Sequence, residues 1–314
     1  EILSGLVGSE MCIRDSTTLI HTLRRRWFSI GLLLCLAVGL PVGCTKLEEK
    51  ERELVFRIEP GTASWFHGLP AGVKNMTLSV PEFGDSQNIH AWWWPARKAD
   101  APTLLYLHGS RWNLTGQLFR IEQLHAMGFS VLAIDYRGFG ESRGELPSER
   151  TLYEDAEIAW QRLTELQPDP AKRFIYGHSL GGAVAVNLAD SLGRDHHTPP
   201  LAGLIIESTF TNLADAATSV AAEYTSLPVR WLLSQKFDSL SKIGDIKVPV
   251  LIAHGTGDRY VPARFSESLY QAANQPKRLL LIDGGNHNNS MRTGSREYRE
   301  AIRTLFSQQM IGKG

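Results

Sequence analysis

The chain has 314 residues, of which 43% are hydrophobic and 21% are charged. This composition suffices for one large buried core and is unlike that of a generally disordered chain. The 33 lysine and arginine residues are balanced by 33 aspartate and glutamate residues. Without a net positive field to hold nucleic acid, we expect no nucleic-acid partner.

Residues 1–16 read as a leader that is separate from the fold. The stretch LVGSEMCIRDS (Leu6 to Ser16) has neither helical nor strand periodicity, and it is similar to translated adaptor or cloning sequence. We therefore expect residues 1–16 to be non-native and exclude them from fold reasoning. A genuine disordered leader is the alternative.

Residues 17–44 have the features of an export signal. Arg24, Arg25 and Arg26 precede an uncharged, mostly apolar run, residues 27–40. The run is shorter than the roughly 20 residues of a membrane span but matches the apolar region of a signal peptide. It leads into LPVGC, which resembles the lipobox of bacterial lipoproteins, whose cysteine is acylated and becomes the new N-terminus. Pro41 departs from the usual aliphatic residue, so ordinary signal-peptidase cleavage and a retained anchor stay open.

The cysteines favour lipidation at Cys44. The three cysteines of the chain, Cys12, Cys35 and Cys44, all lie in this first segment. Cleavage before Cys44 would leave only the lipid-bearing cysteine and no internal disulfide. We therefore expect an exported protein of the bacterial cell envelope, either a membrane-anchored lipoprotein facing the periplasm or a secreted protein.

Residues 45–72 are expected to be a tether and lead-in. The segment KLEEKERELVFR, residues 46–57, is highly charged and has few apolar side chains to bury. Such a segment would hold a folded domain off the membrane surface.

Residues 73–314 show the alternation that is typical of an α/β domain. Short β-rich runs alternate with amphipathic helical patterns, which predicts a mostly parallel central sheet with helices on both faces. The predicted strands are residues 73–80, 88–95, 103–109, 130–136, 172–179, 201–208, 249–255 and 277–283. The first two form an antiparallel hairpin. Helices are predicted at 114–127, at 152–166, from Leu180 onward and at 295–309.

Two further features of this domain lead to specific expectations. The connection 209–248 is much longer than a normal α/β loop, so we predict a small helical lid insertion of two helices that partly shades the site. The run Trp92-Trp93-Trp94 falls in a strand, where neighbouring side chains point to opposite faces. Ordinary packing is therefore favoured over a membrane-binding patch.

The sequence Gly177-His178-Ser179-Leu180-Gly181 is the strongest signal for chemistry. It matches the G-x-S-x-G nucleophile elbow, and it lies directly between a predicted strand and a predicted helix. The strained turn lifts the Ser179 hydroxyl clear of the backbone, and side chains at the two glycines would collide across it. We predict that Ser179 is the nucleophile.

A serine hydroxyl needs a base, and the base needs an orienting acid. In proteins with this elbow, both follow the serine in the chain and lie in loops after later strands. His287, in GGNHNN, and Asp258, in GTGDRYVP, fit this order. Glu207, at the end of an earlier strand, is the rival acid and is expected to be structural. His178, His108 and His254 are also expected to be structural, since each belongs to a strand end or to the elbow.

The oxyanion formed during acyl transfer needs two backbone N–H donors. Leu180 supplies one at the start of its helix, and Ser110, after His108-Gly109, is the candidate for the second. The adjacent Arg111 and Trp112 line the entrance or decorate the surface, and the sequence leaves both alternatives open.

Five motifs, LYLHGS, DYRGFGES, GHSLGG, HGTGDRYVP and GGNHNN, resemble those of the serine-aminopeptidase/lysophospholipase-like branch of the α/β-hydrolase fold. They are similar in particular to the small-lid group that includes depalmitoylase-like enzymes. The likeness covers roughly residues 73–309. It implies hydrolysis of ester, thioester or sometimes amide bonds with no metal or cofactor. Related loops often carry Asn where this chain has Ser110, which affects a side-chain role but leaves backbone donation intact.

The leading functional hypothesis is a serine hydrolase that cleaves small-molecule or lipid acyl esters, or thioesters, through an acyl-enzyme. A serine peptidase or aminopeptidase is one alternative, and it would need a site for a substrate amine or carboxylate. A non-catalytic envelope scaffold is the other, and a complete set of triad residues speaks against it.

Overall fold

The computed structural model describes residues 45–81, 83–195, 200–221, 230 and 233–307. The chain forms two compact units, residues 1–50 and 51–314. The expected leader, the expected signal peptide and Cys44 lie outside the described residues. In the first unit, residues 45–50 are helical. No helix in the described part of the chain is both long enough and apolar enough to cross a bilayer.

The second unit is built on one eight-stranded sheet with the order β1-β2-β4-β3-β5-β6-β7-β8. Strand β2 pairs antiparallel with β1 and with β4, and all other neighbours pair parallel. The strands are β1 Lys74–Val80, β2 Gly84–Trp94, β3 Thr103–Leu107, β4 Ser130–Ile134, β5 Arg173–His178, β6 Gly203–Glu207, β7 Val250–Gly255 and β8 Lys277–Ile282. Every residue of β3, β4, β6 and β7 is buried, as their unbroken apolar runs require.

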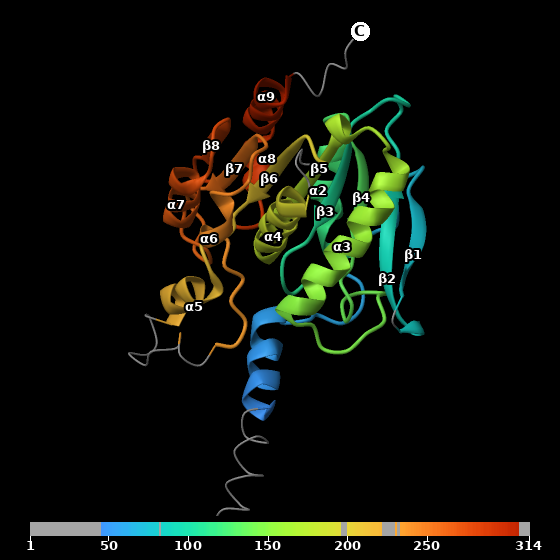
Figure 1. Cartoon of the computed structure of the whole chain (residues 1–314), viewed down its shortest axis with the longest axis vertical. Coiled ribbons are helices and arrows are strands. Elements are labelled where there is room, and N and C mark those ends of the chain that lie inside the picture. The colour runs from blue at the N-terminus through green and yellow to red at the C-terminus, as the bar shows by residue number, and fades with distance from the viewer. Residues whose placement is uncertain (1–44, 82, 196–199, 222–229, 231–232, 308–314) are drawn as a thin grey trace, which may run out of the picture. The chain divides into compact units, whose positions relative to one another are not determined.

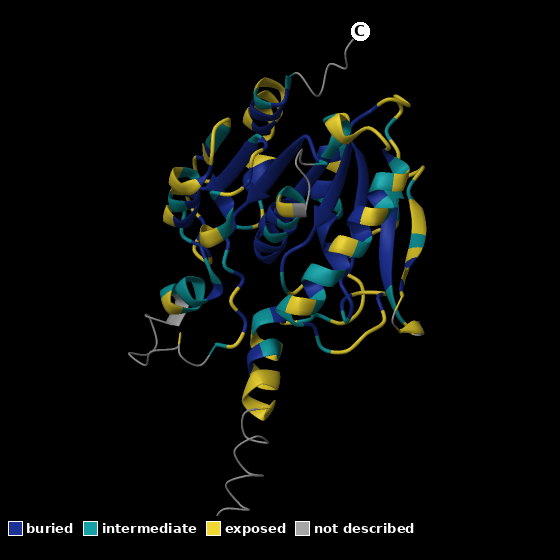
Figure 2. Cartoon of the chain, in the orientation of Figure 1, coloured by how far each residue is buried: buried dark blue, intermediate teal, exposed yellow. Residues whose placement is uncertain are grey.

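Helices cover both faces of this sheet. Their bounds are α2 Leu114–Ala126, α3 Glu149–Leu166, α4 Leu180–Asp195, α5 Leu213–Ala221, α6 Leu240–Ile243, α7 Arg264–Ala272, α8 Ser290–Thr293 and α9 Ser295–Leu305, with the 3-10 turn η1 Pro170–Lys172. Helices α3, α4, α6 and α7 pack into one core cluster and α2, α8 and α9 into the other. Figure 1 shows α3 and α4 lying across one face, and Figure 2 shows the buried strands between the layers. The predicted α/β-hydrolase architecture is therefore confirmed.

Two helices differ in detail from the prediction. Helix α3 begins at Glu149 and not at Leu152, because Ser148 and Thr151 form a capping box that starts the helix earlier. Helix α7 was not predicted, although Phe265 and Leu269 form an apolar i, i+4 pair that faces the core. The connection 209–248 contains two helices, α5 and α6, in its described residues, as expected.

Packing also extends upstream of residue 73. Residues 51–56 are helical, and Phe56 and Ala63 are completely or almost completely buried. The three tryptophans of β2 behave as alternating strand residues: Trp92 and Trp94 pack with one core cluster and Trp93 with the other. Ordinary packing of this run is confirmed.

Candidate active site

The nucleophile elbow joins β5, in the middle of the sheet, to α4. Ser179 has a positive φ of 55°, a strained conformation for a residue with a side chain. A Cβ atom on Gly177 would overlap the carbonyl oxygen of Gly181, and one on Gly181 would overlap that of Leu107. The two glycines are therefore required by close approach across the turn. The Ser179 N–H donates to the Glu207 carbonyl at 2.9 Å, which fixes the turn to β6.

The structure brings Ser179, His287 and Asp258 into one hydrogen-bonded chain. His287 Nε2 lies 3.0 Å from Ser179 Oγ, and His287 Nδ1 lies 2.7 Å from Asp258 Oδ2. His287 thus has one ring nitrogen on the Ser179 hydroxyl and the other on the Asp258 carboxylate. This is the arrangement in which an imidazole can accept the serine proton while a carboxylate fixes its tautomer.

Asp258 is held as a carboxylate by its surroundings. Its side chain is fully buried, and Oδ1 accepts the N–H groups of Tyr260 and Val261, both at 2.9 Å. Burial opposes ionisation, but hydrogen bonds from His254 and His287 outweigh it and hold the pKa of Asp258 below its ordinary value. An ionised acid in this position can stabilise a positive charge on His287.

The side chain of the rival acid Glu207 lies in a buried network that does not include the His287 ring. Tyr176 and Ser290 donate their hydroxyls to its carboxylate, and no contact joins Glu207 to the His287 ring in the described residues. The other histidines also have structural partners. His254 contacts Ser266 Oγ at 2.6 Å and the Val261 carbonyl at 2.7 Å.

Of the two candidate oxyanion donors, one adjoins Ser179 in the chain and the other follows a residue that lies close to Ser179. Leu180 is the next residue of the elbow and the first of α4. Gly109, which precedes Ser110, lies so close that an added Cβ would be 3.1 Å from the Ser179 Cβ. The backbone after Ser110 is fixed, because the Arg111 N–H donates to the Phe56 carbonyl at 2.8 Å. Phe56 belongs to the charged segment 46–57, and apart from its apolar side chain nothing in that sequence indicated this contact with the loop of Ser110.

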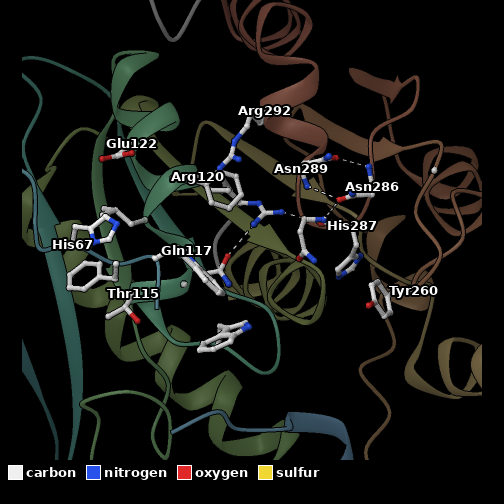
Figure 3. A pocket seen from close by; sticks show the side chains of 18 of the residues that line it. His67, Thr115, Gln117, Arg120, Glu122, Tyr260, Asn286, His287, Asn289 and Arg292 are labelled. Atoms are coloured by element: carbon white, nitrogen blue, oxygen red, sulfur yellow. Dashed lines mark hydrogen bonds between the residues drawn. The ribbon is translucent and has the colours of Figure 1, made fainter. Parts of the chain in front are cut away.

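A cleft of about 1270 Å³ opens beside His287. Its walls include the aromatic side chains Trp65, Trp112 and Tyr260. The rings of Trp65 and Trp112 pack edge to face, with their centroids 4.9 Å apart. Trp112 thus lines the cleft, whereas Arg111 pairs with Glu59 at 3.0 Å. Figure 3 shows His287 and Tyr260 on one side of this space. Of the two alternatives left open by the sequence, lining the entrance applies to Trp112, and a surface position applies to Arg111.

The cleft also has charged side chains. Its lining includes Arg259, from the loop after β7, Arg292, from α8, and one carboxylate, Glu122. A fourth charged residue, Arg120, is buried and paired with Glu207. The surface of the cleft therefore carries more positive than negative charge. Sequence reasoning did not identify these arginines, because nothing in their local pattern places them beside His287.

Metal ligands were not expected from the sequence. Among the residues that the structure describes, no group of three or more His, Cys, Asp and Glu side chains is arranged to hold a metal ion.

Comparisons with known proteins agree with the fold and the motifs. A profile of the family described as serine aminopeptidase, S33, matches residues 101–242. An uncharacterized Mycobacterium tuberculosis protein, Rv2307c, is 35% identical over 245 residues, which cover 77% of this chain and 82% of that protein. The lysophosphatidylserine lipase ABHD12 of Danio rerio is 37% identical over 229 residues, covering 68% of this chain and 56% of that protein.

A solved structure extends the likeness to the fold. The esterase Pf2001 of Pyrococcus furiosus superposes with a TM-score of 0.64 at 18% identity, covering 81% of this chain and 97% of that one. At this identity the similarity shows the shared fold, and the chemistry has to be argued from the site.

Proposed function

Because this chain belongs to the serine aminopeptidase S33 family of α/β hydrolases and is a hydrolase, we propose that it cleaves carboxylic esters, thioesters included, by a Ser179–His287–Asp258 triad. The observation that carries the proposal is the continuous chain from Ser179 Oγ through both His287 nitrogens to Asp258 Oδ2. Few arrangements other than nucleophilic catalysis need a serine on a strained turn with an acid-backed imidazole beside it.

The proposed reaction has two halves. Ser179 Oγ attacks the acyl carbonyl, and His287 Nε2 takes the hydroxyl proton. The N–H groups of Leu180 and Ser110 bind the oxyanion. When the intermediate collapses, His287 returns the proton to the leaving alcohol or thiol, and the acyl group stays on Ser179. Water, deprotonated by His287, then releases the acid and restores the serine.

The cleft favours an ester whose leaving group carries a negative charge. The guanidinium groups of Arg259 and Arg292 suit a phosphate or carboxylate, and the aromatic walls suit apolar parts of a substrate. The name of the relative ABHD12, a lysophosphatidylserine lipase, supports a lipid ester of this class. We therefore propose lysophospholipid-like esters as the substrate class.

We also propose a location, on the basis of the N-terminal pattern. The arginine cluster Arg24–Arg26, the short apolar run and Cys44 support export and lipid anchoring in a bacterial envelope. A membrane tether would place the cleft near acyl lipids, in agreement with the proposed substrate class.

A panel of p-nitrophenyl esters of increasing acyl length, run beside aminoacyl-anilides, tests this function. Ester turnover should exceed anilide turnover, and Ser179→Ala should reduce it by a factor of about 10⁴ or more while circular dichroism is unchanged. A fluorophosphonate should label the wild type and spare the variant.

The contrary outcomes are also informative. Anilide turnover above ester turnover would favour the peptidase alternative, and an unlabelled, inactive wild type would favour a scaffold. Undiminished turnover by purified Ser179→Ala would refute the proposed mechanism.

A further inference from the structure

Arg120 is a deeply buried charged side chain close to the site. It belongs to α2 and its residue is only 1% exposed. Its Nε lies 3.5 Å from Oε2 of Glu207, whose side chain is fully buried. Burying two charges is costly unless they are paired and hydrogen-bonded. Apolar residues of similar volume can often replace a buried ion pair without loss of stability. The presence of charges at this position therefore needs another explanation.

The guanidinium binds the backbone of the catalytic histidine. Arg120 Nη2 donates to the His287 carbonyl at 3.1 Å, while Nη1 donates to Gln117 Oε1 at 3.2 Å. Figure 3 shows Arg120 reaching from α2 to the His287 loop. The loop is otherwise exposed on one side and is held locally by Asn286 and Asn289, which bond each other.

His178 takes part in the same contact. Its Nε2 lies 2.9 Å from the His287 carbonyl and 3.1 Å from Arg120 Nη2. Burial, and then the positive charge of Arg120, hold the pKa of His178 well below its ordinary value, so the ring is neutral. Whichever ring nitrogen bears the single proton, Arg120 remains a donor to the His287 carbonyl.

The anionic partner holds the other end of the same loop. Ser290, three residues after His287, donates its hydroxyl to Glu207 Oε1. The main chain of Glu207 is equally engaged, because its carbonyl accepts the N–H of Ser179 at 2.9 Å. The two side chains of the ion pair therefore contact the histidine loop at His287 and at Ser290, while the backbone of Glu207 contacts that of Ser179.

We propose that the buried Arg120–Glu207 pair is a positioning device that sets His287 Nε2 against Ser179 Oγ. In this proposal Arg120 and Glu207 act on the loop and take no part in proton transfer. They fix the loop through the His287 carbonyl and Ser290, and the loop fixes the imidazole. This inference rests on the proposed function, since it concerns the geometry of the proposed base. A displacement of about 1 Å in such a contact can cost 10²-fold in rate.

The test is the double variant Arg120→Met/Glu207→Gln, which removes both charges at nearly constant volume. The single variant Arg120→Met strands a buried carboxylate and should have a lower melting temperature. The double variant should recover that loss yet still show kcat at least about tenfold below wild type, with KM within about twofold. Rates are expressed per folded molecule from circular dichroism, so that incomplete folding does not enter kcat.

A matched control separates positioning from the loss of an arginine as such. Arg299→Met removes an exposed guanidinium that donates to the Ala126 carbonyl, away from the histidine loop, and should leave kcat unchanged. If kcat per folded molecule of the double variant matched wild type, the ion pair would be purely structural and the inference would be wrong. An inactive, unlabelled wild type would instead refute the proposed function itself.

Discussion

At the scale of single residues, two buried carboxylates show how environment separates roles. Asp258 accepts two backbone N–H groups and faces the His287 ring. Glu207 faces Arg120, Tyr176 and Ser290. The first set of contacts leaves one carboxylate oxygen for an imidazole, whereas the second uses the carboxylate to hold structure together. In the proposed mechanism, the same functional group therefore orients a base in one place and anchors a loop in the other.

This difference predicts unequal effects of two isosteric substitutions. Asp258→Asn should lower kcat by about 10⁴-fold with little change in melting temperature, because the amide orients the wrong His287 tautomer. Glu207→Gln should lower kcat far less but destabilise the fold by about 3–5 kcal/mol, because it leaves Arg120 buried without a counter-charge. Steady-state kinetics and urea unfolding of both variants check this. Reversed effects on kcat would assign the acid to Glu207.

At the scale of elements, the cleft depends on segments that are far apart in the sequence. Helix α2, the loop that precedes it and the segment around Trp65 form part of its lining, and the loops after β7 and β8 and helix α8 form the rest. Parallel strands deliver those loops to one edge of the sheet. The charge of the cleft is therefore a property of several elements at once.

The element-scale prediction concerns substrate preference. Arg259→Gln/Arg292→Gln should raise KM about tenfold for a lysophosphatidylglycerol, because charge-assisted hydrogen bonds to phosphate are lost. The KM for a monoacylglycerol with the same acyl chain should change less than about twofold. Added salt should weaken the preference of the wild type in the same direction.

Arg296→Gln is the matched control for that pair. Arg296 is exposed on α9, where it contacts Glu297 at 3.4 Å, and it does not line the cleft. Its loss should leave both KM values unchanged. If the double variant changed KM equally for the phosphate-bearing and the neutral ester, the cleft arginines would not recognise the negative charge of the substrate.

At the scale of the whole molecule, buried neutral His178 predicts how stability depends on pH. Its folded pKa lies well below the ordinary value of 6.5, so the unfolded chain binds this proton more readily than the folded one. Stability should therefore fall as the pH drops below about 6.5, with a limiting slope of about 1.4 kcal/mol per pH unit from this group. Above that pH the group is neutral in both states and contributes no slope.

Urea unfolding between pH 7.5 and 5 measures this dependence. His178→Gln keeps a polar side chain in the elbow but removes the titration, so its stability should vary less over the same range. An equal slope in wild type and variant would show that other groups cause the acid sensitivity.

A second whole-molecule prediction concerns attachment to membranes. In a bacterial host, wild-type protein should partition with membranes and incorporate radioactive palmitate, because several acyl chains on a processed cysteine anchor stably. Cys44→Ser should lose the label and either stall as a precursor or appear soluble. Esterase activity of a form starting near Lys46 should persist, since it retains every triad residue. Soluble, unlabelled wild type cleaved elsewhere would identify an ordinary secretory signal, with Pro41 as the reason.

The sequence alone determined the alternation of strands and helices and the order of the three candidate triad residues. Buried parallel strands have continuous apolar sequences, and the elbow requires glycines at fixed spacing. Both features can therefore be recognised from a short stretch of sequence. The early start of α3 and the short helix α7 were missed, since they depend on a capping contact and on a brief amphipathic pattern.

Only the tertiary structure decided what surrounds the triad. Arg120 is an ordinary helical residue in sequence, yet folding buries it against Glu207, 87 positions later, and against the His287 loop. Phe56 supports the loop of Ser110 from within a charged segment. Arg259 and Arg292 line the same cleft. These contacts join residues that have no common local pattern, so the fold must form before their partners are defined.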